Sequence, residues 1–260
     1  MSRATFITLF ACKLAAIGLA VAAVTLPDRR LWVEASLLFF GVDLWVLYHL
    51  FIPSAQGLCR NFTRFKTTHR EVWLTIDDGP DVLDTPLILD LLDRHDAKAT
   101  FFVIGERAAL HPELLTEITQ RGHEIGHHTQ THPVMTFWCA SLDRVHRELD
   151  QALTVLRAAG VRPRWFRSPV GIKNFLLPAA LAERKLACVG WSIRSGDCLS
   201  RQPEQVATRV RRHLRPGAIV LMHEGPSVPP AVRVKAIRLV LEALVAENYR
   251  CVLPKPDQLR

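Results

Sequence analysis

Two groups of polar side chains have the types and the spacing needed to hold a metal ion and hydrolyse a bond. The first is the acidic pair Asp77-Asp78, which follows the apolar run 72–76 and precedes Gly79-Pro80. An apolar, β-prone run that ends in two carboxylates predicts a buried strand. That strand would deliver the carboxylates to a loop at its C-terminal end, where α/β barrels carry their chemistry. The alternative is an ordinary Asp-Gly turn.

The second group is the histidine pair His128 and His132, four residues apart in the segment 126–133. On one helical turn the two rings would share a face and could hold one ion. Two neutral imidazoles and one carboxylate form a three-ligand zinc site with a position left open for water, which is typical of catalytic zinc. Histidines at this spacing are common on surfaces, so the interpretation depends on the acidic pair upstream.

A regular alternation of strand-like and helix-like runs, from residue 71 onward, would position these groups. The predicted strands cover 71–76, 99–104, 123–126, 165–167, 187–191, 218–222 and 250–253. The predicted helices cover 85–95, 112–121, 142–159, 176–184, 203–214 and 232–247. Such alternation predicts a parallel sheet covered by helices, and about seven strands in so short a chain favour a tightly wound (β/α) barrel.

The N-terminal part has a different composition. Runs 5–26 and 31–52 are apolar apart from isolated charged or histidine side chains, and each is long enough to cross a bilayer as a helix. We therefore expect a two-helix membrane anchor in residues 1–53, joined at 27–30, a basic linker in 54–70 and a catalytic domain in 71–260. A cleaved signal peptide is the alternative for the first run, but the second run follows it directly.

Two charged residues lie inside the expected spans. Lys13 lies eleven residues before Val24, and Asp43 lies twelve after Leu31, so an antiparallel helical hairpin brings them to a similar depth. Because lone charges are costly at that depth, we predict a Lys13–Asp43 ion pair.

Charge and cysteine content indicate the surroundings of the chain. The net charge is +8 without any Lys/Arg block or aromatic-basic interleaving, which excludes a nucleic-acid partner and favours a membrane surface or an anionic lipid-linked substrate. Basic residues flank the two outer ends of the hairpin more than its connection. They predict a two-pass protein of the inner membrane with its catalytic domain in the cytoplasm. The six cysteines lack framework spacing and favour free thiols in a reducing compartment.

Five ordered blocks make the chain resemble the polysaccharide deacetylase family, also called the NodB-homology domain, of carbohydrate esterase type. The resemblance covers about 72–253. Segment 75–80 reads TIDDGP against the family's TFDDGP, 128–133 matches H[ST]xxHP, and 167–171 is close to RxPYG. The remaining blocks are 191–197 and 221–223. The resemblance implies a distorted (β/α) barrel with fewer than eight complete units.

The resemblance also implies a role for each matched residue. Asp78, His128 and His132 would bind a divalent metal, for which zinc is the first choice. Asp77 would be the general base and Arg167 its ion-pair partner. His223 would be the general acid, which an amine leaving group requires, and Asp197 would orient it.

On the substrate side, the backbone N–H of Val170 would help to hold the oxyanion, and Trp191 and Leu221 would line a small acyl pocket. The chain departs from the family pattern here, because Val170 replaces the usual Tyr. Arg194 and Cys198 stand where the family has an Asp and a groove-lining Trp. We therefore do not expect a groove for a long polymer, and Arg194 adds a cation that could meet a phosphate. His127 replaces the usual Asn and is either a bystander or a competing metal ligand.

These observations predict a metal-dependent hydrolase that removes an acetyl or formyl group from the nitrogen of an amino sugar, on a lipid-linked or glycolipid substrate. An O-acyl carbohydrate esterase with the same site is one alternative; its better leaving group would make His223→Ala nearly harmless. The other is a non-catalytic sugar-binding domain, which the intact set of acidic and histidine residues disfavours. A structural zinc site would unfold on chelation, whereas a catalytic one would lose activity alone.

Overall fold

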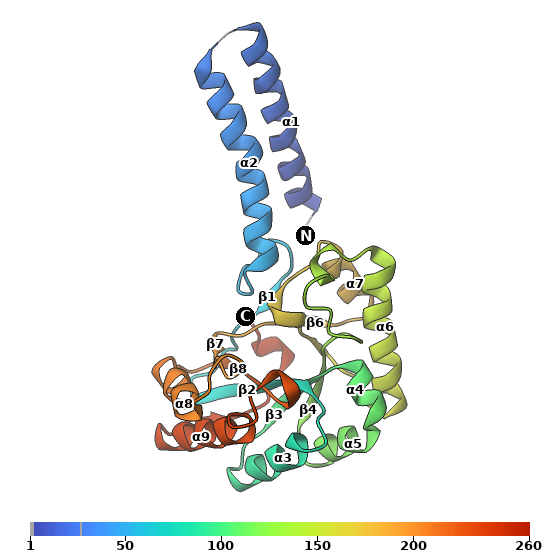
Figure 1. The fold of residues 1–260 in the computed structure, drawn as a ribbon, viewed down its shortest axis with the longest axis vertical. Helices are drawn as coiled ribbons and strands as arrows, with labels where there is room; N and C mark the ends of the chain where they lie inside the picture. Colours follow the sequence, from blue (N-terminus) through green and yellow to red (C-terminus); the bar gives the residue numbers. More distant parts are fainter. Residues whose placement is uncertain (1–2, 27) are drawn as a thin grey trace.

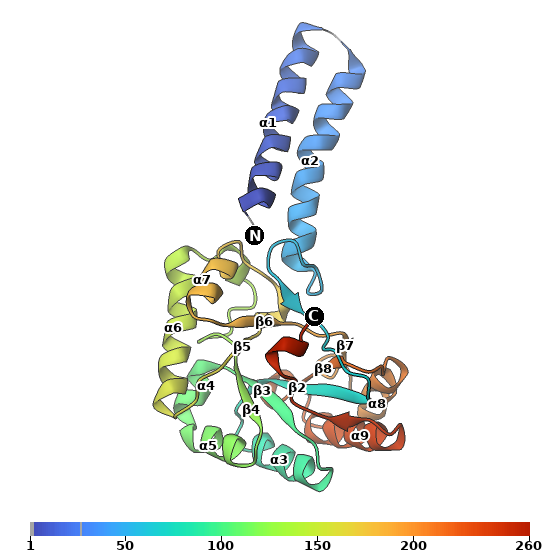
Figure 2. The ribbon, with the colours of Figure 1, turned by 180° about the vertical axis from the view of Figure 1, so that it is seen from behind.

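Two long helices stand on an α/β domain in the computed structural model, which describes residues 3–26 and 28–260 (Figures 1 and 2). Helices α1 (Arg3–Thr25) and α2 (Arg29–Phe51) form an antiparallel hairpin. Both are long and apolar enough to cross a membrane, judged by length and composition. The expected connection 27–30 includes Pro27, which lies outside the described residues. Asp28 caps α2 by accepting a hydrogen bond from Arg30 N at 2.8 Å.

The predicted ion pair inside the hairpin is present. Lys13 Nζ lies 2.8 Å from Asp43 Oδ1 and also donates to the carbonyl of Phe39 at 2.8 Å. The ammonium group lies 3.5 Å from the centroid of the Phe39 ring. The charge of Lys13 is therefore met by an anion, a carbonyl and an aromatic face.

The expected distorted (β/α) barrel is confirmed as a parallel sheet curled into a half-barrel, with helices packed around it (Figures 1 and 2). The strand order is β1-β6-β5-β4-β3-β2-β8-β7, and β9 pairs with β2. The strands are β1 (Asn61–Phe62), β2 (Glu71–Gly79), β3 (Ala99–Val103), β4 (Glu124–His127), β5 (Trp165–Phe166), β6 (Ala187–Val189), β7 (Ile193–Arg194), β8 (Ala218–His223) and β9 (Arg250–Cys251). The remaining helices are α3 (Asp84–Arg94), α4 (Gly105–Leu110), α5 (Pro112–Gln120), α6 (Leu142–Ala158), α7 (Leu177–Glu183), α8 (Pro203–Arg212) and α9 (Arg233–Ala246).

Strand β2 is the centre of the core because it is covered on both faces. Val72, Trp73, Leu74 and Ile76 are fully buried, as expected for a parallel strand between two layers. Helix α6 packs its predicted apolar face inward, and Ser141 caps its first turn by accepting from Arg144 N at 3.4 Å. All strands run in parallel, so their C-terminal ends meet at one edge, where the polar motifs lie.

Two strands and one α-helix escaped prediction, namely β1, β7 and α4, as did the short 3-10 helices. Strand β1 lies in the segment 54–70 and pairs with β6, and Phe65 of the same segment is buried in the core. One boundary also needs correction. The acidic pair was expected in a loop after residue 76, but β2 continues through Asp77 and Asp78 to Gly79. Its pairing with β3 shifts register between Asp77 and Gly79, as in a β-bulge.

The Lys13–Asp43 pair can be tested by a double-mutant cycle on the full-length chain in mixed micelles. Lys13→Ala and Asp43→Ala each leave one ionisable group without its partner. We expect each to lower the free energy of unfolding by about 1–3 kcal/mol. The double variant removes both charges and should be more stable than either single variant. A double variant no more stable than the singles, measured by denaturing-detergent titration, would refute the coupling.

Candidate metal centre and active site

Most of the predicted site residues line one cavity of about 230 Å³ at the C-terminal edge of the sheet. They come from β2, from the loops after β4 to β6, and from β7 and β8. Arg167 and Asp197 lie directly behind this lining and contact Asp77 and His223 respectively. The lining includes Asp77, Asp78, His128, His132, Val170, Trp191, Arg194, Leu221 and His223.

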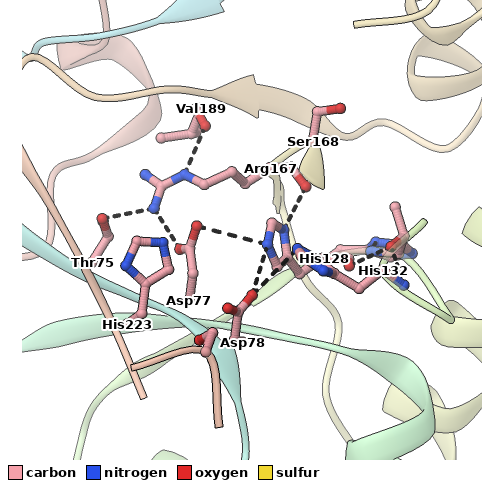
Figure 3. Close-up of polar contacts among 12 residues, drawn as sticks. Thr75, Asp77, Asp78, His128, His132, Arg167, Ser168, Val189 and His223 are labelled. Carbon is pink, nitrogen blue, oxygen red and sulfur yellow. Dashed lines mark hydrogen bonds and ion pairs between the residues drawn. The ribbon is translucent and has the colours of Figure 1, made fainter. Parts of the chain in front are cut away.

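Asp78, His128 and His132 converge as the predicted ligand set (Figure 3). The Nε2 atoms of His128 and His132 lie 3.5 and 3.3 Å from Asp78 Oδ1, and one ligand atom from each residue falls within 4.8 Å of the others. The expected helical turn between the two histidines is wrong. Residues 128–133 form an irregular loop in which Thr129 and His132 have φ values of 66° and 53°. The two rings meet through this left-handed backbone and not through helical spacing.

The chemistry of these three side chains fits a divalent cation. Asp78 Oδ1 is buried and has no hydrogen-bond partner among the described residues. His128 Nδ1 donates to the carbonyl of Arg167 at 2.7 Å, so in the singly protonated ring Nε2 presents its lone pair toward Asp78. A buried carboxylate oxygen facing the lone pair of an imidazole nitrogen is an arrangement that a shared cation stabilises.

The ionisation of the ligands agrees with this fit. Burial, with His128 nearby as a second cause, lowers the pKa of His132 to about 4, which keeps its imidazole neutral. Burial alone would raise the pKa of Asp78, but a hydrogen bond from His128 and the positive charge of the His128 and His132 rings, when these are protonated, outweigh it and hold that pKa well below its usual range. The site therefore offers an anionic carboxylate and the neutral imidazole of His132 near neutral pH, beside the ring of His128.

Asp77 is fixed by a buried ion pair. Its Oδ1 accepts from Arg167 Nη1 at 2.6 Å, while Oδ2 lies on the side of His128 Nε2, 3.7 Å away (Figure 3). The guanidinium also donates to Thr75 Oγ1 at 2.8 Å and stacks over the Phe102 ring, 4.1 Å from its centroid. One carboxylate oxygen is thus held and the other is left toward the cavity, which suits a proton acceptor.

His223 forms a second dyad with Asp197. Asp197 Oδ1 lies 2.9 Å from His223 Nδ1, and Oδ2 accepts from the backbone N–H of His223 at 2.8 Å. Burial alone would lower the pKa of His223, but the Asp197 carboxylate outweighs it and raises that pKa well above its usual value. Cys198 also lies near Asp197 and His223. Ser195 Oγ and the backbone N–H of Cys198 also donate hydrogen bonds to Asp197 Oδ1. This carboxylate is therefore better suited to orient His223 than to bind a second ion.

The residues predicted on the substrate side line the cavity at different depths. Val170, in the short helix η2 (Pro169–Gly171), has a φ of 48° and is partly exposed. Trp191 is half-buried, Leu221 is buried, and Arg194 is exposed at the rim. His127 is not a competing ligand. Its Nε2 lies 2.9 Å from the Leu149 carbonyl and its Nδ1 accepts from Thr129 N at 3.0 Å, so both ring nitrogens are used away from the cavity.

Sequence reasoning missed the side chain that shapes the metal loop. Glu148 Oε2 accepts from the backbone N–H groups of Gln130 and Thr131 at 2.9 Å each, and Oε1 accepts from Thr131 Oγ1 at 2.6 Å. Glu148 is buried on α6. Its place on the apolar face of the predicted helix was the available signal, since a carboxylate there requires polar partners.

Sequence reasoning also missed Glu224, which holds the backbone of the acidic pair. Glu224 is fully buried, and its backbone N–H donates to the Asp77 carbonyl at 3.0 Å. Burial raises the pKa of Glu224 to about 8, and Thr85 Oγ1 donates to its Oε2 at 2.5 Å. A Cβ on Gly79 would collide with the Glu224 carboxyl, so this position of the DDGP motif requires glycine. Arg107 donates from the other side to the Asp78 carbonyl.

Comparisons with known proteins agree with this geometry. The polysaccharide deacetylase family profile matches residues 65–188. A chitooligosaccharide deacetylase of Bradyrhizobium sp. strain ANU 289 is 40% identical over 177 residues, which are 67% of this chain and 79% of that protein. A peptidoglycan-N-acetylglucosamine deacetylase of Bacillus cereus is 34% identical over 70% of this chain and 66% of its own length. The structure of a family 4 carbohydrate esterase from Streptomyces lividans in complex with acetate superposes with a TM-score of 0.66. It is 27% identical over 74% of this chain and 97% of that one.

Glu148→Gln tests whether this buried carboxylate holds the metal loop. An amide can accept through only one oxygen and would present its NH₂ group to the donors of Gln130 and Thr131. We expect the affinity for zinc to fall by about 10–100-fold, as measured by competition with a chromogenic chelator. Glu113→Gln, at an exposed site on α5, is the matched control and should bind as the unmodified chain does. Equal affinities for both variants would show that the loop does not depend on Glu148.

Proposed function

This chain belongs to the polysaccharide deacetylase family, and we propose that it removes the acetyl group from the nitrogen of an amino sugar carried by a membrane lipid. Membership makes it a hydrolase of carbon–nitrogen bonds other than peptide bonds, acting on N-acetylated amino sugars. The names of its relatives favour acetyl over formyl. The identity of the metal, the residue roles and the lipid are the further steps that we propose.

We assign the divalent ion to Asp78, His128 and His132, and we propose zinc. Two imidazoles and one carboxylate are a set that zinc accepts while one position stays open. Bound there, the ion would supply Lewis-acid chemistry, acidifying water and polarising the acyl carbonyl. The unpartnered Asp78 Oδ1 opposite two imidazole nitrogens is the single observation that carries this assignment.

The proton steps fall to the two dyads on either side of the ligands. Asp77 would take a proton from the attacking water at Oδ2, because its Oδ1 is held by Arg167. His223 would give a proton from Nε2 to the leaving nitrogen, because its Nδ1 faces Asp197. Water adds to the carbonyl carbon, the C–N bond breaks, and the products are acetate and the free amine. The N–H of Val170 is our candidate donor to the carbonyl oxygen.

A lipid-linked substrate is supported by features outside the catalytic groups. The hairpin of α1 and α2 is long and apolar enough to anchor the enzyme in a membrane. Arg194 places a guanidinium at the cavity rim, where it could pair with a phosphate of the lipid carrier. We propose a two-pass protein of the inner membrane, with the anchor in 1–53, a linker in 54–70 that packs on the sheet through β1 and Phe65, and the catalytic domain in 71–260. The flanking basic residues favour the cytoplasm as the side on which that domain lies.

Asp77→Asn tests the proposed reaction in cells. The amide cannot accept the proton from water, so the substrate lipid should accumulate with its acetyl group retained. Mass spectrometry of membrane lipids should show one species heavier by one acetyl group than in cells with the unmodified enzyme. Asp90→Asn, at an exposed surface ion pair, is the control and should leave the lipids unchanged. Identical lipid profiles for both variants, with normal protein levels, would argue against a lipid-linked amino sugar.

The His223–Asp197 dyad predicts a specific pH dependence. The general acid must be protonated, so the rate falls as pH rises through the pKa of His223, which Asp197 holds well above its usual value. The Asp197→Asn substitution removes the carboxylate that raises the pKa of His223. Burial, which lowers this pKa, remains, so the pKa of His223 should fall. The alkaline limb of the kcat profile on a soluble chitooligosaccharide should therefore move to lower pH. If the alkaline limb stays at the same pH in Asp197→Asn, His223 is not the general acid.

A further inference from the structure

Five exposed apolar side chains gather at the end of the catalytic domain from which the hairpin rises. They are Met135, Trp138, Leu142, Phe175 and Leu176, here called the apolar collar, and their exposed fractions run from 37% to 80%. Figures 1 and 2 show that α7 and the start of α6, which border the collar in sequence, lie at the hairpin end of the domain. Grouped exposed apolar side chains, unlike scattered ones, mark an interaction surface.

The collar is connected to the end of α2 by a dense set of contacts. The Phe51 ring, at the last residue of α2, lies 5.6 Å from the Trp138 ring. Lys173 donates from its backbone N–H to the Leu50 carbonyl at 2.9 Å and from Nζ to the Ile52 carbonyl at 2.7 Å. The collar and the hairpin base are therefore held as one unit.

A single amide side chain joins the two halves of the collar. Asn174 Nδ2 lies within hydrogen-bond distance of the Phe137 and Ala140 carbonyls, at 2.8 and 3.0 Å, in and beside the short helix η1 (Phe137–Cys139). Its Oδ1 accepts from Leu176 N at 2.8 Å. The segment that carries Phe175 and Leu176 is thus fixed against the segment that carries Met135 and Trp138.

The collar is also free of charge, in a chain with 22% charged residues. Segments 133–142 and 174–182 contain no Asp, Glu, Lys or Arg. Lys173 lies next to them, but it is buried with its ammonium group on carbonyls of the hairpin base. A patch whose two segments carry no charged residue disfavours an ionic protein partner and suits the boundary between lipid headgroups and acyl chains.

We propose that the apolar collar is a membrane-contact surface that inserts into the headgroup region of the bilayer crossed by the hairpin. The proposal rests on the membrane anchor of the proposed function. Helix α2 has 23 residues, about 35 Å at the helical rise, so it spans the hydrocarbon layer and ends near its edge. Phe51 then lies at the interface, and Trp138, in contact with it, occupies the depth that tryptophan favours.

This surface would bring the cavity to the lipid. Val134 and Val170 line the cavity. Val134 directly precedes the collar residue Met135, and Val170 lies five residues before the collar residue Phe175. An amino sugar attached to a lipid would then reach the metal ligands from the bilayer surface without leaving its membrane. The collar would increase turnover of membrane-embedded substrate and not of a soluble one.

Photocrosslinking of the full-length chain tests the contact directly. The photoreactive p-benzoylphenylalanine is placed at Phe175 or Leu142, and the protein is reconstituted in vesicles of phosphatidylcholine with a minor share of phosphatidylglycerol. Irradiation should give adducts heavier by one phospholipid at both positions. Leu87 on α3 and Val245 on α9 are matched controls, since they are 51% and 55% exposed and their helices lie at the opposite end of the domain. They should give about tenfold less adduct.

Three outcomes would overturn the membrane contact or distinguish its failure from a failure of the proposed activity. Equal lipid adducts at collar and control positions would overturn the membrane contact, as would adducts of twice the chain mass, which would assign the surface to a second copy. For function, Phe175→Ser should lower hydrolysis of a long-chain alkyl glycoside of N-acetylglucosamine in vesicles by about tenfold and leave a soluble chitooligosaccharide unaffected. Lipid adducts without hydrolysis of either substrate by the unmodified enzyme would refute the proposed activity and keep the contact.

Discussion

The buried guanidinium of Arg167 is the group on which the arrangement of this site depends. It is 1% exposed and joins two strands, donating to Asp77 and Thr75 on β2 and to the Val189 carbonyl on β6. Its own carbonyl accepts a hydrogen bond from the Nδ1–H group of His128. One residue thus fixes the proposed base and sets which nitrogen of a metal ligand faces the cavity. A charge so deeply buried is tolerated only with a complete set of partners, and removing one typically costs about 3–5 kcal/mol.

The β-bulge in β2 explains how two adjacent carboxylates serve the same cavity. In a regular strand, neighbouring side chains point to opposite faces, so Asp77 and Asp78 would be separated by the sheet. The register shift between Asp77 and Gly79, together with the φ of 72° at Asp78, turns the second carboxylate back toward the histidines. Glu224 and Arg107 support this unusual backbone through the carbonyls of Asp77 and Asp78. The sequence DDGP therefore sets the backbone conformation of this bulge as well as supplying two carboxylates.

The parts that could be predicted from sequence are those with a local cause. Apolar runs and helical periodicity located the long strands and helices, and residue type and order located Asp78, His128 and His132. The spacing of the histidines was misinterpreted as helical because a four-residue interval has the same appearance in a helix and in a left-handed loop. What holds that loop is Glu148, eighteen residues from Gln130, and such a contact leaves no local pattern. Strands β1 and β7 have two residues each, too few for any period to show.

The segment 167–173 connects the candidate site to the base of the helical hairpin. It begins at Arg167, which holds Asp77, passes Val170 at the cavity mouth, and ends at Lys173, whose ammonium group is bound by carbonyls that follow α2. Burial lowers the pKa of Lys173, and the carbonyls of Ile52 and Pro53 accept hydrogen bonds from its ammonium group. Gly171, between Val170 and Lys173 in this segment, has no room for a side chain, because a Cβ there would collide with Trp191 and Pro53. A displacement of the hairpin base would therefore be transmitted through a few tightly packed residues to the mouth of the cavity. Pro53, at the base of the hairpin, packs against the segment that borders the cavity.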